Sequence, residues 1–285
     1  MIAMFRKVTI SLIFLIGFDI FSYPIVSHWI KTKEHYIIIS QHNEVLARMD
    51  DARKEAERKK AEKYNENISE SSIPIEDPFA EGAQDNGQKG YYNVLNIGET
   101  IGHLQIPKIN VNLPIYHGIS EEVLSQGVGH MSNSSFPIGG KGSHTALTAH
   151  RGLPSTKLFR DLDQLQKDDL FFVKTLGDTL AYKVDDIQIV LPSETNWLSI
   201  EEDKDYVTLI TCDPYMINTH RLLVRGERVP HEQELPEEIL AEVHKDLDEM
   251  SQNINKSIFT FGIVVMFIII LGYAVRKRVF KGDAK

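Results

Sequence analysis

The chain has 285 residues and a globular composition, with 42% hydrophobic and 25% charged residues. This length allows one domain of ordinary size, or at most two, together with flanking segments. The formal net charge is −9, and the central region has no cluster of Lys and Arg. Because phosphate binding needs such a basic face, nucleic acid is excluded as a partner. The single cysteine forms neither an intramolecular disulfide nor, alone, a Cys-based zinc site, and no ligand spacing indicates calcium, so we expect no metal and no cofactor.

The N-terminal segment, residues 1–30, is apolar from position 8 onward, and Arg6 and Lys7 directly precede this apolar stretch. Asp19 near its middle costs about 2.5–3.5 kcal/mol at the centre of a bilayer, and Pro24 interrupts the stretch. An uncleaved signal anchor and a removed signal peptide are both compatible with this pattern. No clear small-x-small cleavage site is present, which favours the anchor. In either case, residues from about 31 to 250 are expected outside the cytoplasm.

Two segments of different character follow. Residues 31–68 are charged and rich in Ala, Lys and Glu, which predicts a helix. Its apolar residues recur near helical spacing: Ile38, Val45, Leu46 and Met49. This helix is either a solvated stalk or a helix packed on the domain. Residues 69–92 are rich in Ser, Pro, Gly, Asp and Asn without hydrophobic periodicity, which indicates a long loop.

The region from 93 to 230 consists of short β-type runs broken by turn residues. The predicted strands are 102–107, 111–116, 144–149, 170–174, 181–191, 206–212 and 220–228. One short helix is expected at 155–165, where the apolar residues are Leu158, Phe159, Leu162 and Leu165. Many strands with few helices indicate a closed or nearly closed β-barrel.

The C-terminal part predicts a second membrane span. Residues 231–256 are acidic and helical in character. Residues 257–275 contain no charge and are long enough to cross the hydrocarbon core of about 30 Å. The basic tail, residues 276–285, opens with three consecutive cationic residues, so the positive-inside rule places the C-terminus in the cytoplasm. With an N-terminal anchor, both termini are expected to be cytoplasmic.

Three chemically distinct side chains lie at the ends of predicted strands. Cys212 closes the run 206–212 and is followed by Asp-Pro, and proline does not continue a central strand. Arg221 opens the next run, so a strand, a loop and a returning strand bring it to the same end of the sheet. His150 lies at the end of the run that begins at His144. A thiol, an imidazole and a guanidinium at strand ends are typical of a reactive site.

The chemistry of such a site is acyl transfer through a thiol. A cysteine attacks a carbonyl as the thiolate, and a neighbouring imidazole or cation lowers its pKa. The imidazole then protonates the leaving amine, and an arginine stabilises the oxyanion or holds the substrate backbone. Spacing alone leaves alternatives open, because a lone cysteine is often a small buried hydrophobe and the chain has eleven histidines. Three other arginines compete for the role of Arg221: Arg151, Arg225 and Arg228.

Asp213 directly follows Cys212, and its charge bears on how readily the thiol ionises. A carboxylate close to the thiol raises the thiol pKa and opposes activation. If residue 213 has extended geometry, its side chain points to the opposite face, and the effect is small.

The segments that carry these residues resemble the sortase family. Residues 208–212 read Thr-Leu-Ile-Thr-Cys, similar to the T-L-x-T-C signature of sortases. Residues 148–152 read Thr-Ala-His-Arg-Gly and resemble the T-G-H-R-G segment around the sortase histidine, with Ala149 in place of a usual glycine. Residues 218–226 are similar to the segment that carries the sortase arginine. The family's opening strands are matched by 106–109 and 113–118.

The resemblance covers about residues 95 to 230 and implies a mainly β fold with an eight-stranded sortase-type barrel, placed at 93–230. Sortases cleave a sorting signal of the Leu-Pro-x-Thr-Gly kind between Thr and Gly. They hold the substrate as a thioester on the cysteine and pass it to an amine. By this resemblance Cys212 is the nucleophile, His150 the general acid/base and Arg221 the stabilising cation.

Two features resemble the class C, pilin-polymerising sortases: the C-terminal span, and Asp77, Pro78 and Phe79, which look like the lid motif of that class. By carry-over, Asp77 pairs with Arg221 and Phe79 covers Cys212, although an ordinary Asp-Pro turn is another interpretation. The implied partners are the membrane and pilin subunits, which carry a C-terminal sorting signal and an acceptor lysine. The alternatives are a sortase that anchors surface proteins to the peptidoglycan precursor and a non-catalytic, membrane-tethered β-domain adaptor.

Overall fold

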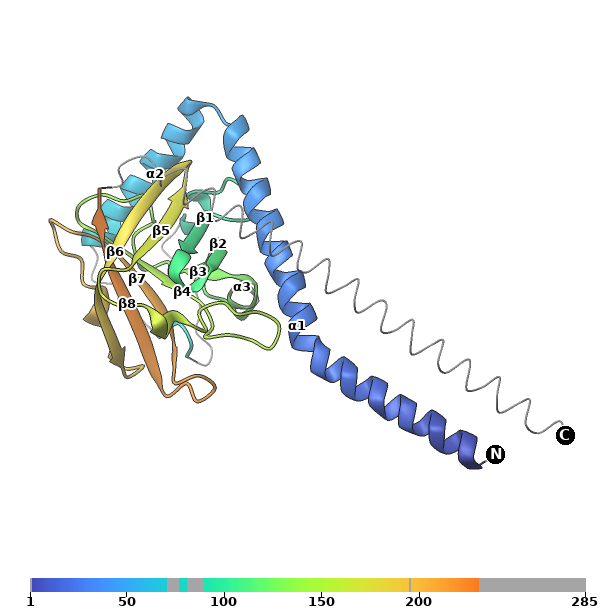
Figure 1. Cartoon of the computed structure of the whole chain (residues 1–285). Coiled ribbons are helices and arrows are strands. Elements are labelled where there is room, and N and C mark those ends of the chain that lie inside the picture. The colour runs from blue at the N-terminus through green and yellow to red at the C-terminus, as the bar shows by residue number, and fades with distance from the viewer. Residues whose placement is uncertain (1, 71–76, 81–89, 195, 231–285) are drawn as a thin grey trace. The chain divides into compact units, whose positions relative to one another are not determined.

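A closed eight-stranded β-barrel dominates the structure, a computed structural model that describes residues 2–70, 77–80, 90–194 and 196–230 (Figure 1). The strands are β1 (Gly102–Ile106), β2 (Val111–His117), β3 (Val128–His130), β4 (Ser143–Thr148), β5 (Leu170–Thr175), β6 (Asp178–Val190), β7 (Asp205–Asp213) and β8 (His220–Val229). Around the barrel they run in the order β1-β2-β3-β4-β7-β8-β6-β5. Neighbours are antiparallel, except that β2 with β3 and β4 with β7 are parallel. The predicted eight-stranded barrel is confirmed.

Three predicted C-terminal segments lie outside the described residues: the linker 231–256, the span 257–275 and the tail 276–285. Of the predicted loop 69–92, the structure describes the two ends and residues 77–80. The second membrane span and the cytoplasmic C-terminus therefore stay predictions.

The sequence pattern and the structure differ in three short elements. The pattern does not predict α3 (Glu121–Gln126), which Ser120 caps through its side chain, or the three-residue strand β3. The helix predicted at 155–165 is wrong, because this segment contains the 3-10 turn η3 (Leu162–Gln164) and no α-helix. Leu158 has a φ of 41°, which a right-handed helix does not allow. The apolar residues of the segment are nevertheless all buried: Leu158, Phe159, Leu162 and Leu165.

The other 3-10 turns are η1 (Tyr91–Asn93), η2 (Pro107–Ile109) and η4 (Asn196–Leu198).

Alternation along β7 and β8 divides the apolar side chains between the barrel interior and one outer cluster. Val207 and Leu209 of β7 belong to the main core with Leu222 of β8, whereas Ile210 and Leu223 belong to the outer cluster. We call this cluster the outer patch. Its buried members are Ile119, Met131, Ala146, Leu198, Ile210 and Leu223, and Phe79, Val190 and Trp197 pack against it.

The N-terminal apolar stretch and the charged residues after it form one long helix, α1 (Ile2–Arg48). The helix continues through Pro24, so the prediction that this proline interrupts it is wrong. Proline removes a single backbone donor, and apolar membrane helices tolerate this loss. The stretch from Thr9 is long and apolar enough to cross a membrane, and the rest of the described structure does not bury its most apolar window. These properties suit a membrane anchor.

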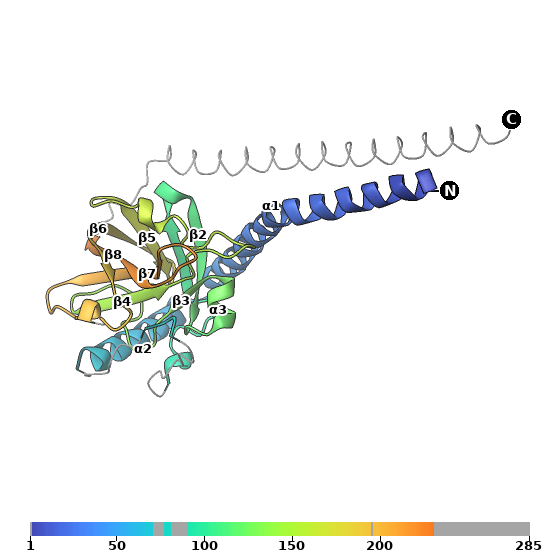
Figure 2. The same ribbon diagram turned by 90° about the horizontal axis from the view of Figure 1, so that it is seen from below.

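The second half of α1 packs on the barrel beside β2 and α3 (Figure 2). Its buried residues recur at spacings of three and four: His35, Ile39, His42, Leu46 and Met49. This burial favours the packed helix over the solvated stalk. The predicted apolar face was only partly right, because Val45 is 44% exposed and Ile38 is half-buried. Two histidines complete the face instead, and His35 Nε2 lies 2.6 Å from a backbone oxygen of α3.

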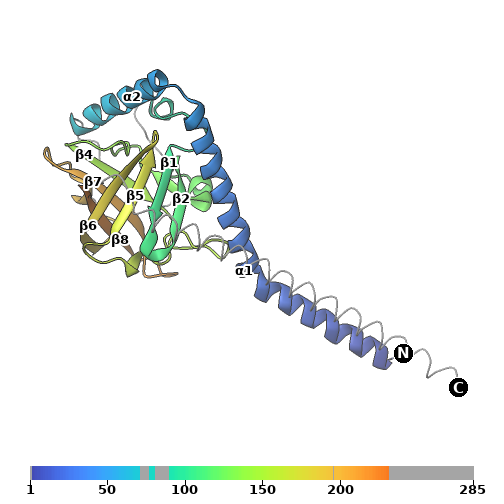
Figure 3. The same cartoon turned by 45° about the horizontal axis from the view of Figure 1, so that its top comes forward.

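The helix α2 (Asp51–Glu70) lies against the barrel through polar as well as apolar contacts (Figure 3). The Tyr64 hydroxyl donates a hydrogen bond to the carbonyl oxygen of Ser132. Asn65 makes two hydrogen bonds with the backbone of Phe136: its Nδ2 donates to the carbonyl at 3.1 Å, and its Oδ1 accepts from the N–H at 2.7 Å. One buried amide therefore satisfies two buried backbone groups that have no strand partner.

Replacing Asn65 by Ala is expected to lower the free energy of unfolding by about 2 kcal/mol, because the buried N–H of Phe136 loses its partner and the Phe136 carbonyl keeps only its hydrogen bond from the N–H of Ile138. Asn67→Ala is the matched control, since Asn67 lies on the exposed face of α2 and reports the helix-propensity gain alone. Urea unfolding of the full chain in detergent micelles, followed by circular dichroism, measures both variants. Equal stability of the two would contradict the role of Asn65 in docking α2.

Candidate active site

The ends of three neighbouring strands bring Cys212, His150 and Arg221 together. β4 and β7 are parallel, and their pairing ends with Thr148 opposite Ile210. His150 and Cys212 each follow that pair by two residues. β7 and β8 are antiparallel, and Cys212 lies directly opposite Arg221. The register therefore delivers all three residues to the same end of the sheet.

The segment that carries His150 remains tied to β7 beyond the last strand pair. The backbone N–H of Ala149 donates to the carbonyl of Ile210 at 3.2 Å, and the Ala149 carbonyl accepts from Thr211 Oγ1 at 2.8 Å. The Ala149 methyl group is fully buried in the main core. Alanine in place of the usual glycine thus fits this position without loosening the histidine.

The Cys212 side chain is 6% exposed, and burial raises the pKa of its thiol. Three charges act on it as well: Arg221 lowers the pKa, Asp77 raises it and Arg151 lowers it. The net shift is upward, so the thiol form dominates at neutral pH in this arrangement. The Asp213 carboxylate is hydrogen-bonded to Arg151, so it is compensated by its own cation.

Asp77 holds the guanidinium of Arg221 in a bidentate ion pair. Nε of Arg221 donates to Oδ1 and Nη2 donates to Oδ2, both at 2.6 Å. The remaining nitrogen, Nη1, donates to the backbone carbonyls of Asn218 at 3.0 Å and His220 at 2.9 Å. The Arg221 side chain is buried, and the Asp77 side chain is mostly buried. The edge of the guanidinium formed by Nε and Nη2 is taken up by Asp77, so this edge is not available to a substrate oxygen while Asp77 stays in place.

Phe79 lies over the site from the same short segment as Asp77. An Asx-type turn, in which the Phe79 N–H donates to Asp77 Oδ1 at 3.4 Å, links the two residues, and Pro78 between them is buried. The Phe79 ring is 5.7 Å from the His150 ring, and the Arg221 guanidinium carbon is 5.3 Å from the Phe79 centroid. The ring also packs against the outer patch.

His150 has an acidic neighbour that the sequence pattern did not indicate. Its Nε2 lies 3.1 Å from Oε1 of Glu121 in the first turn of α3. Glu121 is a typical first-turn acid, and the helix that carries it was not predicted, so no local signal pointed to this pair.

Two of the three competing arginines, Arg225 and Arg228, are engaged away from the thiol. Arg225 lies on the same face of β8 as Arg221, but its Nη2 is 2.6 Å from Oδ2 of Asp185. The guanidinium of Arg228 lies 5.6 Å from the ring centroid of Tyr182. Neither is opposite Cys212 in the strand register.

Arg151 takes part in the site in a different way. Its side chain is 8% exposed, and it binds Asp213 and, through Nη2 at 2.8 Å, Asp163. Its Nη1 also lies 3.4 Å from the carbonyl oxygen of Cys212. Arg151 therefore ties the segment after β4 to the end of β7, while its positive charge lowers the thiol pKa.

Among residues 2–70, 77–80, 90–194 and 196–230, no group of three or more His, Cys, Asp or Glu side chains is arranged to hold a metal ion.

Comparison with known proteins identifies the family of the chain. The sortase-domain family model matches residues 104–229. Sortase D of Bacillus subtilis is 31% identical over 135 residues, which are 46% of this chain and 65% of that protein. Sortase A of Bacillus anthracis is 30% identical over 132 residues, 46% of this chain and 60% of that protein. The chain thus matches less than two thirds of the length of these two relatives.

Solved structures match over nearly their whole length. Streptococcus pneumoniae sortase C is 41% identical with a TM-score of 0.63, covering 68% of this chain and 97% of that one. Sortase C1 of GBS Pilus Island 1 is 39% identical with a TM-score of 0.66, covering 71% and 95%. Sortase C-1 of Actinomyces oris is 44% identical with a TM-score of 0.58, covering 62% and 99%. The family model and these relatives support a cysteine transpeptidase. The chain belongs to the sortase family, and these structural neighbours are class C sortases.

Asp77→Ala is expected to raise the rate of alkylation of Cys212 at neutral pH, because the Asp77 carboxylate raises the thiol pKa and its removal increases the fraction of thiolate. Since only the thiolate reacts, the midpoint of the pH profile moves to lower pH in the variant. In the parent chain it stays above the ordinary cysteine value. Rates with iodoacetamide between about pH 6 and about pH 10, read by intact mass spectrometry, measure the shift.

Asp203→Ala is the matched control, because Asp203 is an exposed acid whose ion-pair partner is Lys141. It should leave the profile unchanged. An Asp77→Ala profile that coincides with that of the parent chain would contradict the electrostatic role of Asp77.

Proposed function

We propose that this chain is a class C sortase that joins pilin subunits, with Cys212 as nucleophile, His150 as general acid/base and Arg221 as stabilising cation. The observation that carries the proposal is the convergence of these residues at the shared end of β4, β7 and β8. The membership of the sortase family supports the reaction class. No cofactor takes part.

In the acylation step, the Cys212 thiolate attacks the carbonyl carbon of the threonine in a Leu-Pro-x-Thr-Gly sorting signal. A carbon–sulfur bond forms, and the carbon–nitrogen bond between Thr and Gly breaks. Protonated His150 gives its proton to the departing glycine amine. Arg221, which is always charged, stabilises the negative charge that develops on the carbonyl oxygen.

In the transfer step, the side-chain amine of a lysine on a second pilin attacks the thioester. A carbon–nitrogen bond forms, the carbon–sulfur bond breaks, and the thiolate of Cys212 is regenerated. Neutral His150 accepts the proton that the amine loses. Glu121, whose Oε1 lies 3.1 Å from His150 Nε2, holds the imidazole ring in position for both proton transfers. The product is an isopeptide bond.

Asp77, Pro78 and Phe79 act as a lid in this proposal. The closed lid engages Arg221 through Asp77 and packs Phe79 on the outer patch. Opening removes the Asp77 charge that raises the Cys212 pKa and frees two guanidinium nitrogens for the oxyanion. The same movement uncovers apolar surface that suits the leucine and proline of the signal.

The pilin as substrate is supported by the neighbours. The structure of Streptococcus pneumoniae sortase C bears on pilin substrate specificity, and sortase C1 of GBS belongs to a pilus island. Within the same proposal, residues 1–30 are an uncleaved anchor, 93–230 the external catalytic domain and 257–275 a second span. The apolar first part of α1 is in keeping with such an anchor.

The test is acylation of the full chain in detergent micelles by a pilin that carries its sorting signal. Mass spectrometry is expected to find a thioester on Cys212 that is absent in Cys212→Ala. His150→Ala is expected to lower the rate by about 10²–10⁴-fold, and Arg221→Ala by about 10²–10³-fold. His220→Ala is the matched histidine control, because the His220 ring contacts Thr219 and not Phe79 or Glu121; it should keep more than half of the rate.

The amine that accepts the acyl group distinguishes a pilus-assembling sortase from an anchoring sortase. A lysine-linked pilin dimer supports pilus assembly, whereas transfer only to the amine of a peptidoglycan precursor identifies an anchoring sortase. If no thioester forms with either substrate, even in Phe79→Ala, the enzymatic proposal is wrong and the adaptor hypothesis takes its place.

A further inference from the structure

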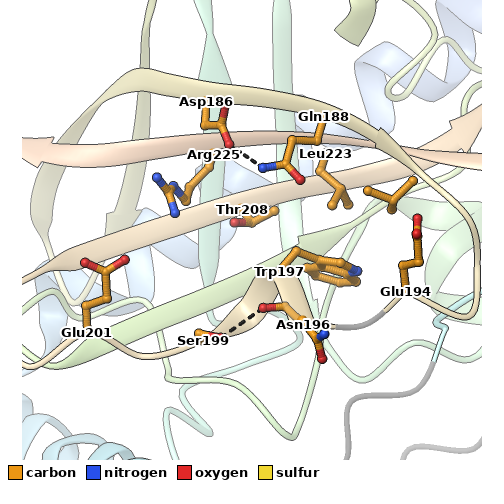
Figure 4. A pocket seen from close by; sticks show the side chains of 11 residues that line it. Asp186, Gln188, Glu194, Asn196, Trp197, Ser199, Glu201, Thr208, Leu223 and Arg225 are labelled. Atoms are coloured by element: carbon orange, nitrogen blue, oxygen red, sulfur yellow. Dashed lines mark hydrogen bonds between the residues drawn. The ribbon is translucent and has the colours of Figure 1, made fainter.

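A polar pocket of about 400 Å³ opens next to the outer patch (Figure 4). Its walls come from β6, from the connection between β6 and β7, and from the outer faces of β7 and β8. Val190, Trp197 and Leu223 belong both to the pocket and to the outer patch, so the two surfaces are continuous.

The strand register fixes where this pocket lies relative to Cys212. Thr208, Ile210 and Cys212 alternate on one face of β7, and Thr208 lines the pocket opposite Arg225. Four residues of strand span about 13 Å, and the outer patch lies between the thiol and the pocket. β7 ends at Asp213, so the sheet surface extends from Cys212 in this direction only.

An extended peptide has the same rise per residue as the strand. With its scissile carbonyl at Cys212, a Leu-Pro-x-Thr-Gly signal places its two apolar residues over the outer patch. The residue just before the leucine, four positions before the scissile threonine, then reaches the pocket. The pocket is therefore in reach of a part of the substrate that the cleaved motif does not include.

The charges of the pocket favour a cation. Asp186, Glu194 and Glu201 line it, and its one basic residue, Arg225, is already bound by Asp185. Asp186 has a lysine nitrogen 4.0 Å away. Within the described part of the chain, Glu194 and Glu201 take part in no ion pair. Two carboxylates next to the cavity thus have no cation paired with them in the described residues, although Glu194 Oε2 accepts a hydrogen bond from the backbone N–H of Leu191 at 2.8 Å.

Trp197 adds a second feature that suits a long basic side chain. Figure 4 shows its indole ring inside the pocket, with Glu194 on one side and Glu201 on the other. The methylene stem of a lysine or arginine packs on such a ring, and its charged head interacts with the π face and with carboxylates. An acidic side chain gains neither contact and meets like charges.

The wall that carries these residues is fixed to the sheet. His144 Nε2 lies 2.7 Å from Thr208 Oγ1, and its Nδ1 lies 3.0 Å from the carbonyl oxygen of Ser199. Burial lowers the pKa of His144 to about 4, so the ring is neutral at pH 7 and adds no positive charge to the pocket. The connection between β6 and β7 is thereby held over Thr208 before a ligand arrives.

We propose that this pocket is a subsite for a lysine or arginine side chain located immediately before the sorting motif of the substrate. The subsite rests on the proposed transpeptidase function. Its determinants are Glu194 and Glu201 for charge and Trp197 for the stem.

The test compares three peptides that differ only in the residue before Leu-Pro-x-Thr-Gly, which is Lys, Ala or Glu. The enzyme is the full chain in detergent micelles with Phe79→Ala to open the lid. The kcat/KM of cleavage is expected to be about tenfold higher for the Lys than for the Glu peptide, with Ala between them. The preference should shrink in 0.5 M salt, because exposed charges are screened.

The double variant Glu194→Gln with Glu201→Gln is expected to reduce the preference to less than about twofold, through a higher KM for the Lys peptide at unchanged kcat. Glu202→Gln is the matched control, since Glu202 lies on the same connection outside the pocket and should keep the full preference. Equal cleavage of the three peptides, or a preference that survives in the double variant, overturns the subsite alone. If no peptide acylates Cys212, the transpeptidase proposal fails and the subsite fails with it.

Discussion

The position of β7 between a parallel neighbour, β4, and an antiparallel neighbour, β8, is the constraint on which the site depends. Parallel pairing makes the ends of β4 and β7 coincide, and antiparallel pairing returns the start of β8 to the same place. One residue of slip in either pairing would turn Cys212 or Arg221 to the barrel interior. The apolar residues on both faces of β7 prevent that slip, because Leu209 must stay in the main core and Ile210 in the outer patch.

The site also depends on the pairing of charged groups around Cys212. A thiol in a buried position lies among two arginines and the carboxylates that bind them, Asp77 for Arg221 and Asp213 for Arg151. Burial and Asp77 keep the thiol protonated, whereas the arginines act in the opposite direction. Of the charged groups that act on the thiol pKa, only Asp77 belongs to a short segment outside the barrel. A movement of that segment can therefore remove its charge from the thiol while both arginines stay in place. Under the proposed function, reactivity and access are therefore coupled through one carboxylate.

The outer patch connects the lid, the thiol and the acidic pocket on one surface. Phe79 packs on it from the lid, and Leu223 and Trp197 continue it into the pocket. In the proposed mechanism the lid and the apolar part of the sorting signal compete for this patch. The lid therefore acts like a weak ligand that belongs to the chain itself. A substrate that makes additional contacts in the pocket binds with a more favourable free energy and displaces the lid more completely.

The sequence alone determined the strand runs, the expected ends of β7 and β8 and the three residues brought together there, because alternation and turn residues are local properties. The family signatures around Cys212 and His150 are also local, and so is the apolar N-terminal stretch.

Other features depend on contacts between distant segments. Val45 lies on the exposed side of α1 and His42 on the buried side, which depends on how the helix meets the barrel. The segment at 155–165 has helical periodicity, but the left-handed backbone of Leu158 and its packing override that propensity. Glu121 beside His150, Arg151 on Asp213 and the acidic pocket were decided by tertiary structure alone, since a charge has no periodic signal and its effect depends on what the fold places within a few ångströms.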